Sequence, residues 1–328
     1  MASRPHVELV EAELRHRIET GADRPGERFA TARQLAASRG ISYQTAHRLL
    51  RRLVEDGLIT RRQGSGTYVA GNAWRPDSVR VILSRRAKRV SSFGGKLQSS
   101  LRETFASATL DYSFSYDVAE ALSGPVLPIL WETPRLLDQC IASRRPAILI
   151  NDRPPPSLGG HHLDAVCADD FAGGALAADV LRRSRSGHAR LVVLGGPESD
   201  RRSSDRIAGF RSRARAREVH AADWFAESGE KAAAQVLDAR PQGVFAANDR
   251  LAEGFLTACR SRGITPPAVI GYDDAPIAEP LGLTTIALPW RDLATAIADR
   301  ARARLSEPDS AACTSLLQPR VIVRASTV

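Results

Sequence analysis

The apolar residues at the start of the chain recur with a helical period. Val7, Val10, Leu14 and Ile18 stand three or four positions apart in a strongly charged background. Apolar residues at this spacing fall on one face of an α-helix, while the charged residues between them face water. The pattern therefore predicts an amphipathic helix that ends before Gly21.

Two more helices follow, and each begins at a recognisable cap. Thr31 and Gln34 have the spacing of a capping box, so the second helix is expected to start at Thr31 and to stop at Gly40. Ser42 is placed to cap a third helix, which carries an apolar stripe and closes at Gly57. Two short helices joined by a glycine-containing turn predict a helix-turn-helix.

The stretch RRQGSGTYV, residues 61–69, predicts a β-hairpin with a thin and basic tip. Gly64 and Gly66 can adopt positive φ angles, and the β-prone segment 67–69 follows. A helix-turn-helix places one helix in the major groove of DNA, where arginine and glutamine read base edges. A hairpin after it forms a wing, whose thin tip approaches phosphates while Arg61 and Arg62 neutralise their charge. The first seventy residues thus predict a DNA-binding domain.

Residues 7–69 resemble the GntR family of bacterial winged-helix regulators. The stretches ETGADRPGERFATARQLAASRGIS, TAHRLLRRLVEDGLI and RRQGSGTYV fall in that family's order and spacing. The resemblance and the polar face of the third helix assign DNA contacts to Arg33, Tyr43, Gln44, Thr45, His47, Arg48, Arg61, Arg62, Gln63, Gly64 and Gly66. Ala30-Thr31 replaces the Pro-Ser of many members, and Tyr43 and His47 stand where arginine is frequent. We therefore expect the same docking mode on a different operator sequence.

After a polar segment, residues 72–78, the pattern changes to short apolar runs separated by helical segments. The runs are 79–83, 126–130, 147–150, 191–194, 243–247 and 268–272. Because they lack clean alternation of apolar and polar residues, we expect buried parallel strands, covered on both faces by helices. Ligands bind to such sheets beyond the carboxyl ends of the strands.

Small polar residues or glycines follow four of these runs. They are Asn151-Asp152, Gly195-Gly196, Asn248-Asp249 and Asp273-Asp274. Asparagine and aspartate suit the hydrogen bonding of vicinal hydroxyl groups, and Trp224 could supply an apolar face for a sugar ring or a base. For each single asparagine or aspartate, the alternative is that it caps a helix or a turn.

Roughly residues 145–326 resemble the sensor domain of the lactose-repressor (LacI) family, which shares its fold with periplasmic sugar-binding proteins. The motifs are VCADDFAGGALAADVL, DRIAGF, GVFAANDRLAEGF, VIGYDDAPIAEPLGLTTI and PRVIVRAST. By position, the resemblance assigns effector contacts to Asn151, Arg206, Trp224, Asn248 and Asp273. Arg206 is expected to donate two hydrogen bonds to ligand oxygens.

The LacI resemblance also implies two Rossmann-like lobes. The first is expected to hold residues 79–168 and 290–313, and the second residues 169–289 and a strand around 320–324. The match is poor between residues 79 and 130. There, SRRAKRVSSFGGKLQ replaces the usual loop and helix start, and SYDVAEALSGPV is too short for a full helical crossover.

Length, charge and missing motifs limit the function classes. With 328 residues the chain is expected to hold a winged helix-turn-helix domain (1–71), a linker (72–78) and a two-lobed α/β domain (79–328) of the periplasmic-binding-protein type. The net charge of +9 favours a polyanionic partner. The chain has no P-loop and no G-x-G-x-x-G after a strand, so we expect neither an enzyme nor a cofactor, and no residues have metal-site spacing.

The combined prediction is a transcription regulator, acting as a repressor, whose binding to double-stranded operator DNA is controlled by a small carbohydrate effector. A two-lobed sensor predicts a homodimer on a two-fold operator. The N-terminus lacks an apolar signal region and no apolar stretch approaches 18 residues, so we expect a cytoplasmic protein without membrane contact. One alternative stays open, in which the same architecture senses a nucleobase, another metabolite or a protein partner.

Overall fold

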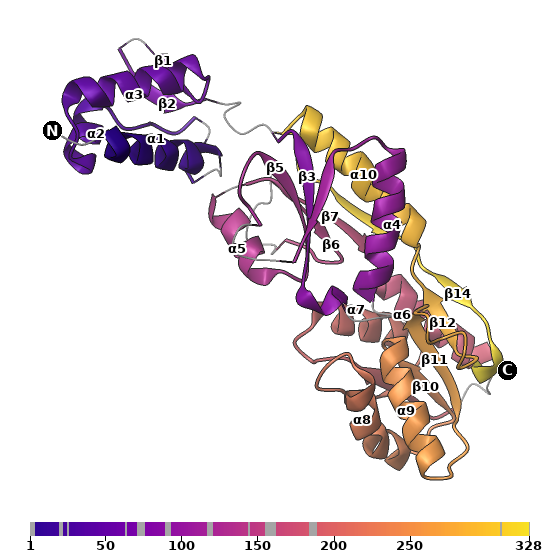
Figure 1. The fold of residues 1–328 in the computed structure, drawn as a ribbon. Coiled ribbons are helices and arrows are strands. Elements are labelled where there is room, and N and C mark those ends of the chain that lie inside the picture. The colour runs from indigo at the N-terminus through magenta and orange to yellow at the C-terminus, as the bar shows by residue number, and fades with distance from the viewer. Residues whose placement is uncertain are drawn as a thin grey trace. The chain divides into compact units, whose positions relative to one another are not determined.

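The N-terminal part of the chain folds as three helices and a hairpin. The computed structural model describes residues 4–19, 22–24, 26–62, 64–70, 76–88, 93–116, 121–143, 145–154, 162–183, 189–308 and 310–327. The first elements are α1 (Arg4–Glu19), α2 (Ala32–Arg39), α3 (Tyr43–Glu55), β1 (Ile59–Arg62) and β2 (Gly66–Val69) (Figure 1). All three predicted helices and the hairpin are confirmed, in the predicted order.

Both predicted caps are also confirmed. The Thr31 hydroxyl accepts a hydrogen bond from the Gln34 backbone N–H at 3.3 Å, and the Gln34 side-chain oxygen accepts one from the Thr31 backbone N–H at 2.9 Å. The Ser42 hydroxyl accepts a hydrogen bond from the Thr45 backbone N–H at 3.1 Å, at the first turn of α3. These bonds satisfy N–H groups that a helix leaves without partners at its start.

The winged helix has a hydrophobic core of its own. Its buried members are Val10, Leu14, Ile18, Phe29, Leu35, Ile41, Ala46, Leu49, Leu50, Leu53, Leu58, Ile59 and Val69. The predicted apolar positions of α1 and α3 are all part of this cluster, with Val7 and Val54 partly buried at its edge. Because the members come from every element between α1 and β2, burial of one shared core holds the helices and the wing together.

The rest of the described chain is built around two six-stranded sheets, which helices accompany. The first has the order β13-β7-β6-β5-β3-β4. Its strands are β3 (Ser78–Leu83), β4 (Tyr112–Ser115), β5 (Val126–Trp131), β6 (Ala147–Ile150), β7 (Leu163–Ala168) and β13 (Thr314–Leu317). Its helices are α4 (Phe93–Ser107), α5 (Pro134–Ser143) and α10 (Trp290–Ser306). From β4 to β7, neighbouring strands run parallel, as predicted.

The second sheet has the order β14-β12-β11-β10-β8-β9. Its strands are β8 (Leu191–Gly195), β9 (Arg217–His220), β10 (Gly243–Ala246), β11 (Ala268–Asp273), β12 (Thr284–Ala287) and β14 (Arg320–Ile322). Its helices are α6 (Asp170–Arg183), α7 (Arg201–Arg211), α8 (Ala226–Asp238) and α9 (Asp249–Ser261). The strands from β9 to β12 run parallel, and β14 is antiparallel to β12.

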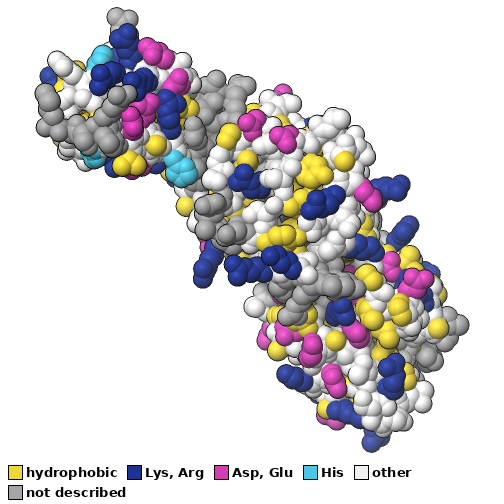
Figure 2. Space-filling model, viewed as in Figure 1, with side chains coloured by type: hydrophobic (Ala, Val, Ile, Leu, Met, Phe, Trp, Pro, Cys, Tyr) yellow, Lys and Arg dark blue, Asp and Glu magenta, His cyan; other side chains and the backbone are white. Residues whose placement is uncertain are grey.

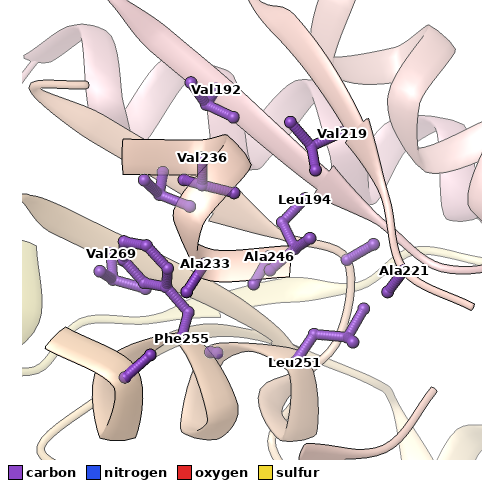
Figure 3. Packing of buried hydrophobic residues seen from close by; sticks show 14 of the residues in the cluster. Val192, Leu194, Val219, Ala221, Ala233, Val236, Ala246, Leu251, Phe255 and Val269 are labelled. Atoms are coloured by element: carbon purple, nitrogen blue, oxygen red, sulfur yellow. The ribbon is translucent and has the colours of Figure 1, made fainter. Parts of the chain in front are cut away.

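Helices cover both faces of the second sheet, which explains its continuous apolar runs. On one face, side chains of β8, β10 and β11 pack against Val236 of α8 and Phe255 of α9 (Figure 3). Phe245 of β10 packs on the other face, where its ring stacks on Phe210 of α7 at a centroid distance of 5.4 Å. Adjacent residues of one strand are therefore both buried, and no polar face remains.

The chain divides into two compact units, close to the expected lobes but not identical to them. The first holds residues 1–85, 101–166 and 295–315, and the second holds 86–100, 167–294 and 316–328. The expectation that residues 86–100 belong to the first lobe is wrong. They group with the second unit, where the Lys96 ammonium donates to the Asp274 carbonyl oxygen at 2.8 Å and lies 5.4 Å from the Trp290 ring.

The shortened connection between β4 and β5 carries no helix in its described part. Residues 121–125 form turns and bends, while residues 117–120 of the SYDVAEALSGPV stretch lie outside the described residues.

A helix that spans a membrane must be both long and apolar. None of the helices of the described residues meets both requirements.

Candidate DNA-binding and effector-binding sites

The predicted DNA-contacting side chains of α3 lie on its exposed face. Tyr43 is 54% exposed, and Gln44, His47 and Arg48 are exposed as well. Thr45 is half-buried, and its hydroxyl lies 2.8 Å from the hydroxyl of the N-cap serine. The buried leucines of α3 face the core, so these polar residues point away from it. Their side chains can form hydrogen bonds to base edges.

The arginines of the winged helix fall into paired and unpaired groups. Arg51 and Arg52 each contact an acidic side chain, at 3.1 and 2.8 Å. Among the described residues, no carboxylate forms an ion pair with Arg33, Arg48 or Arg61. Figure 2 shows arginine and acidic side chains interspersed on one face of this domain. The arginines that form no ion pair among the described residues are available to a polyanion.

The wing has the predicted positive φ angles at its tip. Ile59 pairs with Val69 and Arg62 with Gly66. Gly64 has a φ of +75° and Gly66 a φ of +129°, which are conformations that favour glycine. An added Cβ at Gly64 would meet nothing within 4 Å, so its backbone angle rather than packing requires glycine there. The predicted contact Gln63 lies outside the described residues.

The segment before α2 extends the wing to a third strand-like element, which the sequence pattern did not predict. The Phe29 N–H donates to the Thr67 carbonyl oxygen at 2.7 Å, and the Val69 N–H donates to the Glu27 carbonyl oxygen at 2.9 Å. These bonds place Arg28 beside β2. The alternation around Arg28 is too short to read as a strand, so nothing in the sequence indicated this contact.

The second unit brings four of the five predicted effector contacts into one region. Arg206 lies on α7, and Asp273 is the last residue of β11. Trp224 lies two residues before α8, and Asn248 is the N-cap of α9. Asn151 belongs to the first unit, where it follows β6 with a φ of +50° and is buried. The four residues converge at the carboxyl ends of the parallel strands, as the fold predicts.

Arg206 is the centre of this region and is buried, with 3% exposure. Its Nε donates to Asp170 at 2.8 Å, its Nη1 donates to the Ala247 carbonyl oxygen at 2.6 Å, and its Nη2 lies 3.6 Å from Asp273. The guanidinium carbon lies 3.7 Å from the centre of the Tyr272 ring. Burial by itself lowers the pKa of Arg206, but the two carboxylates raise that pKa above its ordinary value.

Two of the five N–H groups of Arg206 are used within the protein. Nε and Nη1 each donate to a protein acceptor, while Nη2 has no hydrogen-bond acceptor among the described residues. Asp170 at the start of α6, which no prediction singled out, holds Arg206 in place. Nη2 lies beside the Asp273 carboxylate, and the expected pair of hydrogen bonds from Arg206 to a ligand stays a prediction.

Asp273 combines a strained backbone with a buried carboxylate oxygen. Its φ is +100°, a strained angle for a residue with a side chain, and its buried Oδ1 has no hydrogen-bond partner among the described residues, although it lies 3.6 Å from Arg206 Nη2. Burial raises the pKa of Asp273 to about 6, against the opposing charge of Arg206 and with the added repulsion of Asp170. This oxygen can accept a hydrogen bond from a ligand.

The turn after β11 is capped by a carboxylate other than that of Asp273. The carboxylate that caps this turn belongs to Asp249, which accepts a hydrogen bond from the Ala275 N–H at 2.6 Å. Asp249 also accepts from the Thr285 hydroxyl at 2.6 Å and is fully buried. Burial, followed by the charge of Asp273, raises the pKa of Asp249 well above its ordinary value. Asp249 is thus a structural group that supports Asp273.

Asn248 and Trp224 form one hydrogen-bonded unit. The Asn248 side-chain oxygen accepts from the Leu251 N–H at 2.8 Å, so Asn248 caps α9, as the alternative for a single asparagine proposed. Its amide nitrogen donates to the Trp224 carbonyl oxygen at 3.0 Å. The Trp224 indole N–H donates to Asp200 at 2.9 Å, and a Cβ added to Gly196 would lie 2.6 Å from the indole ring. Trp224 is therefore fixed at both ends, and is 8% exposed.

Two glycines fix the distance between the helices that carry Asp170 and Arg206. A Cβ added to Gly174 of α6 would lie 2.0 Å from the Arg206 carbonyl oxygen. A Cβ added to Gly209 of α7 would lie 1.9 Å from the Phe171 carbonyl oxygen. The backbones of α6 and α7 thus touch directly, and this contact sets the short Asp170–Arg206 distance.

Comparison with known families agrees with the two resemblances. Residues 7–69 match the family described as bacterial regulatory proteins, gntR family, and residues 181–327 match the periplasmic binding protein-like domain. The chain therefore joins a GntR-family helix-turn-helix domain to a LacI-type, periplasmic-binding-protein-like sensor domain.

Relatives and solved structures extend this comparison. The HTH-type transcriptional regulator DegA of Bacillus subtilis is 32% identical over 57% of this chain and 58% of its own length. The HTH-type transcriptional repressor PurR of Vibrio cholerae is 33% identical over 40% of this chain and 42% of its own. The chain thus spans about half the length of these curated relatives. The structure of a transcriptional regulator CelR–cellobiose complex has a TM-score of 0.65 and 20% identity, covering 91% of this chain and all of that one, which shows the shared fold.

Proposed function

We propose that the protein is a DNA-binding transcription regulator, acting as a repressor, whose operator binding is controlled by a small neutral carbohydrate. The observation that carries the proposal is the exposed polar face of α3, in a domain that matches the GntR family. The arginines that flank this face pair with no carboxylate of the described chain. The relatives are transcriptional regulators, not enzymes, which supports a binding function. Such a protein acts in the cytoplasm, where its operator is.

Gln44 and Arg48 have the roles of base readers in this proposal. Both lie on the exposed face of α3, and both side-chain types form paired hydrogen bonds to base edges in the major groove. Arg33 and Arg61 contact phosphates, because they are exposed and no carboxylate of the described residues pairs with them. A homodimer presents two such surfaces to a two-fold operator.

The charges of the second unit favour an uncharged effector. The nearby cations are already engaged, since Arg206, Arg202, Lys96 and Arg324 each contact a carboxylate. Among the described residues, the buried Oδ1 of Asp273 is an acceptor without a hydrogen-bond partner, and the hydroxyl of the adjacent Tyr272 has none either. Hydroxyl donors of a sugar match this acceptor, whereas a phosphate or carboxylate group would face repulsion without an unpaired cation to offset it.

Trp224 completes the proposed effector site with an aromatic ring held by Asn248 and Asp200. Asn151 is also proposed as an effector contact, on the basis of its position in the LacI resemblance alone. The CelR structure was solved with cellobiose, a neutral sugar, which supports the same ligand class. A nucleobase with N–H donors would also suit an aspartate beside an aromatic ring, so purines belong in the test.

Two measurements test the proposal. A thermal-shift screen compares neutral sugars, phosphorylated sugars and purines, and a ligand at 100 times its Kd should stabilise the protein by about 2.7 kcal/mol. Selection of bound duplexes from a random DNA pool identifies the operator, and the selected ligand is then added to the complex. If no DNA sequence is enriched, the proposal of a DNA-binding regulator is wrong. If only phosphorylated sugars stabilise the protein, the proposal of a neutral effector is wrong.

A further inference from the structure

We propose that Arg28 and Arg62 form a second phosphate-binding surface on the wing, and that residue 66 is glycine so that Arg28 can lie across it. This inference rests on the proposed DNA-binding function and adds a residue, Arg28, to it. The surface consists of Arg28, Arg62 and Tyr68, and is called the outer wing face below.

The register of the wing places these three side chains on one face. Arg28 and Tyr68 form an antiparallel bridge, and Arg62 pairs with Gly66 two positions along β2 from Tyr68. Paired residues share a face of the sheet, and so do residues two positions apart along a strand. Val69, which points to the opposite face, is buried in the core. The outer wing face therefore points away from the core.

Tyr68 holds both the wing tip and Arg62. Its hydroxyl lies 2.6 Å from the Ser65 hydroxyl and donates to the Ser65 carbonyl oxygen at 3.2 Å. The guanidinium carbon of Arg62 lies 4.8 Å from the centre of the Tyr68 ring. An arginine stacked on an aromatic ring keeps its N–H groups, which lie in the plane of the guanidinium, free for two hydrogen bonds to a phosphate.

Arg28 lies over the one position of β2 that has no side chain. A Cβ added to Gly66 would lie 3.2 Å from Arg28 Nε and 3.5 Å from its Nη2. The guanidinium thus occupies the space that a side chain at position 66 would take. This contact gives Gly66 a role besides its positive φ, because even a Cβ at position 66 would press on the Arg28 guanidinium and shift it by a few tenths of an ångström.

Neither arginine of the outer wing face is neutralised by an acidic residue. Among the described residues no carboxylate pairs with Arg28 or Arg62, and the adjacent Glu27 contacts Arg24 instead, at 3.5 Å. Two like charges on one small face repel each other, and an anion between or above them relieves that repulsion. The phosphates of a DNA backbone are the anions that a wing meets.

The test measures salt dependence on the selected operator by fluorescence anisotropy. Arg28→Gln keeps a polar side chain over Gly66 but removes the charge, and Arg24→Gln is the matched control, because Arg24 is already paired with Glu27. We expect Arg28→Gln to weaken binding to all sequences alike and to reduce the slope of log K against log salt by about 0.9. Arg24→Gln should leave the slope unchanged.

A second measurement tests the role of Gly66. Gly66→Ala is made in the parent and in the Arg28→Ala background. The φ strain is common to both, so the displacement of Arg28 appears as a coupling, with Gly66→Ala weakening DNA binding about twofold more in the parent. Additive effects would overturn the role of Gly66, and a parental salt slope for Arg28→Gln would overturn the phosphate contact. If the parent itself selects no DNA sequence, the proposed regulator fails, which is a separate outcome.

Discussion

The winged helix and the second unit both use arginine, but in opposite ways. Arg48 and Arg61 are exposed and pair with no carboxylate of the described residues, whereas Arg206 is 3% exposed and contacts two carboxylates. A long polyanion brings its own counter-charges, so the groups that bind it can stay in water until it arrives. A small ligand has few groups, so the protein must hold its binding groups rigid and already desolvated.

This difference separates binding from stability. On the winged helix, replacing an unpaired arginine removes a contact with the partner and leaves the fold intact. In the second unit, the same type of replacement leaves a buried charge without its partner, so the fold and the ligand response suffer together. The predictions below test this separation.

The largest effect is expected for Arg206→Ala. It leaves Asp170 buried and uncompensated, and breaking a buried pair from one side costs about 3–5 kcal/mol. We expect a loss of this order in the free energy of unfolding of the second unit, measured by urea denaturation. The matched control is Arg211→Ala on the same helix, because Arg211 forms an exposed pair with Glu218 that contributes at most about 1 kcal/mol. Equal losses for the two variants would contradict the structural role of the Asp170–Arg206 pair.

Asp273→Ala should affect the ligand more than the fold. Asp249, not Asp273, caps the turn after β11, so the fold should persist. Loss of a charge-assisted hydrogen bond to the ligand costs about 2 kcal/mol, which corresponds to an affinity about 30-fold lower. Calorimetry with the ligand found in the screen measures this change, while operator binding without ligand should equal that of the parent. Ligand binding with parental affinity would remove Asp273 from the site.

Effector affinity should fall as the pH is lowered from 7 to 5. The pKa of Asp273 is raised to about 6, so its carboxylate is mostly ionised at pH 7 and mostly protonated at pH 5. A ligand that donates to the ionised form should bind about tenfold more weakly at pH 5. Asp273→Asn should bind weakly at both pH values, and calorimetry across this range compares the two proteins.

The stability of the ligand-free protein should change with the opposite sign. The folded pKa of Asp273, about 6, lies above the ordinary value of 3.8, so the folded state binds the proton more readily than the unfolded state does. The contribution of this group to stability therefore increases as the pH falls through 6. Urea denaturation of the parent and of Asp273→Asn isolates that contribution, and parallel pH profiles for the two proteins would show that Asp273 titrates normally.

The smallest effect on the molecule is expected for Gln44→Ala. Gln44 is exposed, so the free energy of unfolding should not change. Its loss should relax the preference for one base pair by about 1 kcal/mol, because a paired hydrogen bond to a base edge discriminates by this order. Repeating the DNA selection with the variant measures the change. If Gln44→Ala weakens binding to all DNA sequences equally, Gln44 contacts phosphates and not base edges.

The sequence pattern predicted the strands that are continuous apolar runs because both of their faces are buried. It did not predict the strands that contain polar or exposed residues. β4, β9 and β13 are edge strands with partly exposed side chains, so they carry no such run. β7 contains Asp164, which is buried against Arg304 at 2.6 Å. β12 begins with Thr284 and Thr285, which are buried by partners far along the chain. A polar residue in a buried strand needs a hydrogen-bond or ion-pair partner. The pattern of apolar and polar residues does not locate that partner when it lies far away in the sequence.

The candidate sites show the same limit. Family resemblance placed Arg206 and Asp273 in one region because motif positions carry over between related chains. It did not reveal that Asp170 holds Arg206, or that Arg28 lies over Gly66, because each pair joins segments distant in sequence. The exposed face of α3 was predictable in full, since the period of a single helix determines it.

The backbone contact between α6 and α7 has a consequence for how such a protein can diverge. Gly174 and Gly209 each lie against a carbonyl oxygen of the other helix, so no residue with a side chain fits at either position. Substitution of Trp224 or Asp273, by contrast, changes side-chain contacts and leaves the backbone contact between α6 and α7 in place. New effector preferences can therefore arise by changing side chains at the strand ends, while the two glycines stay fixed. A library that varies the strand ends and keeps both glycines should yield folded proteins far more often than one that varies the glycines.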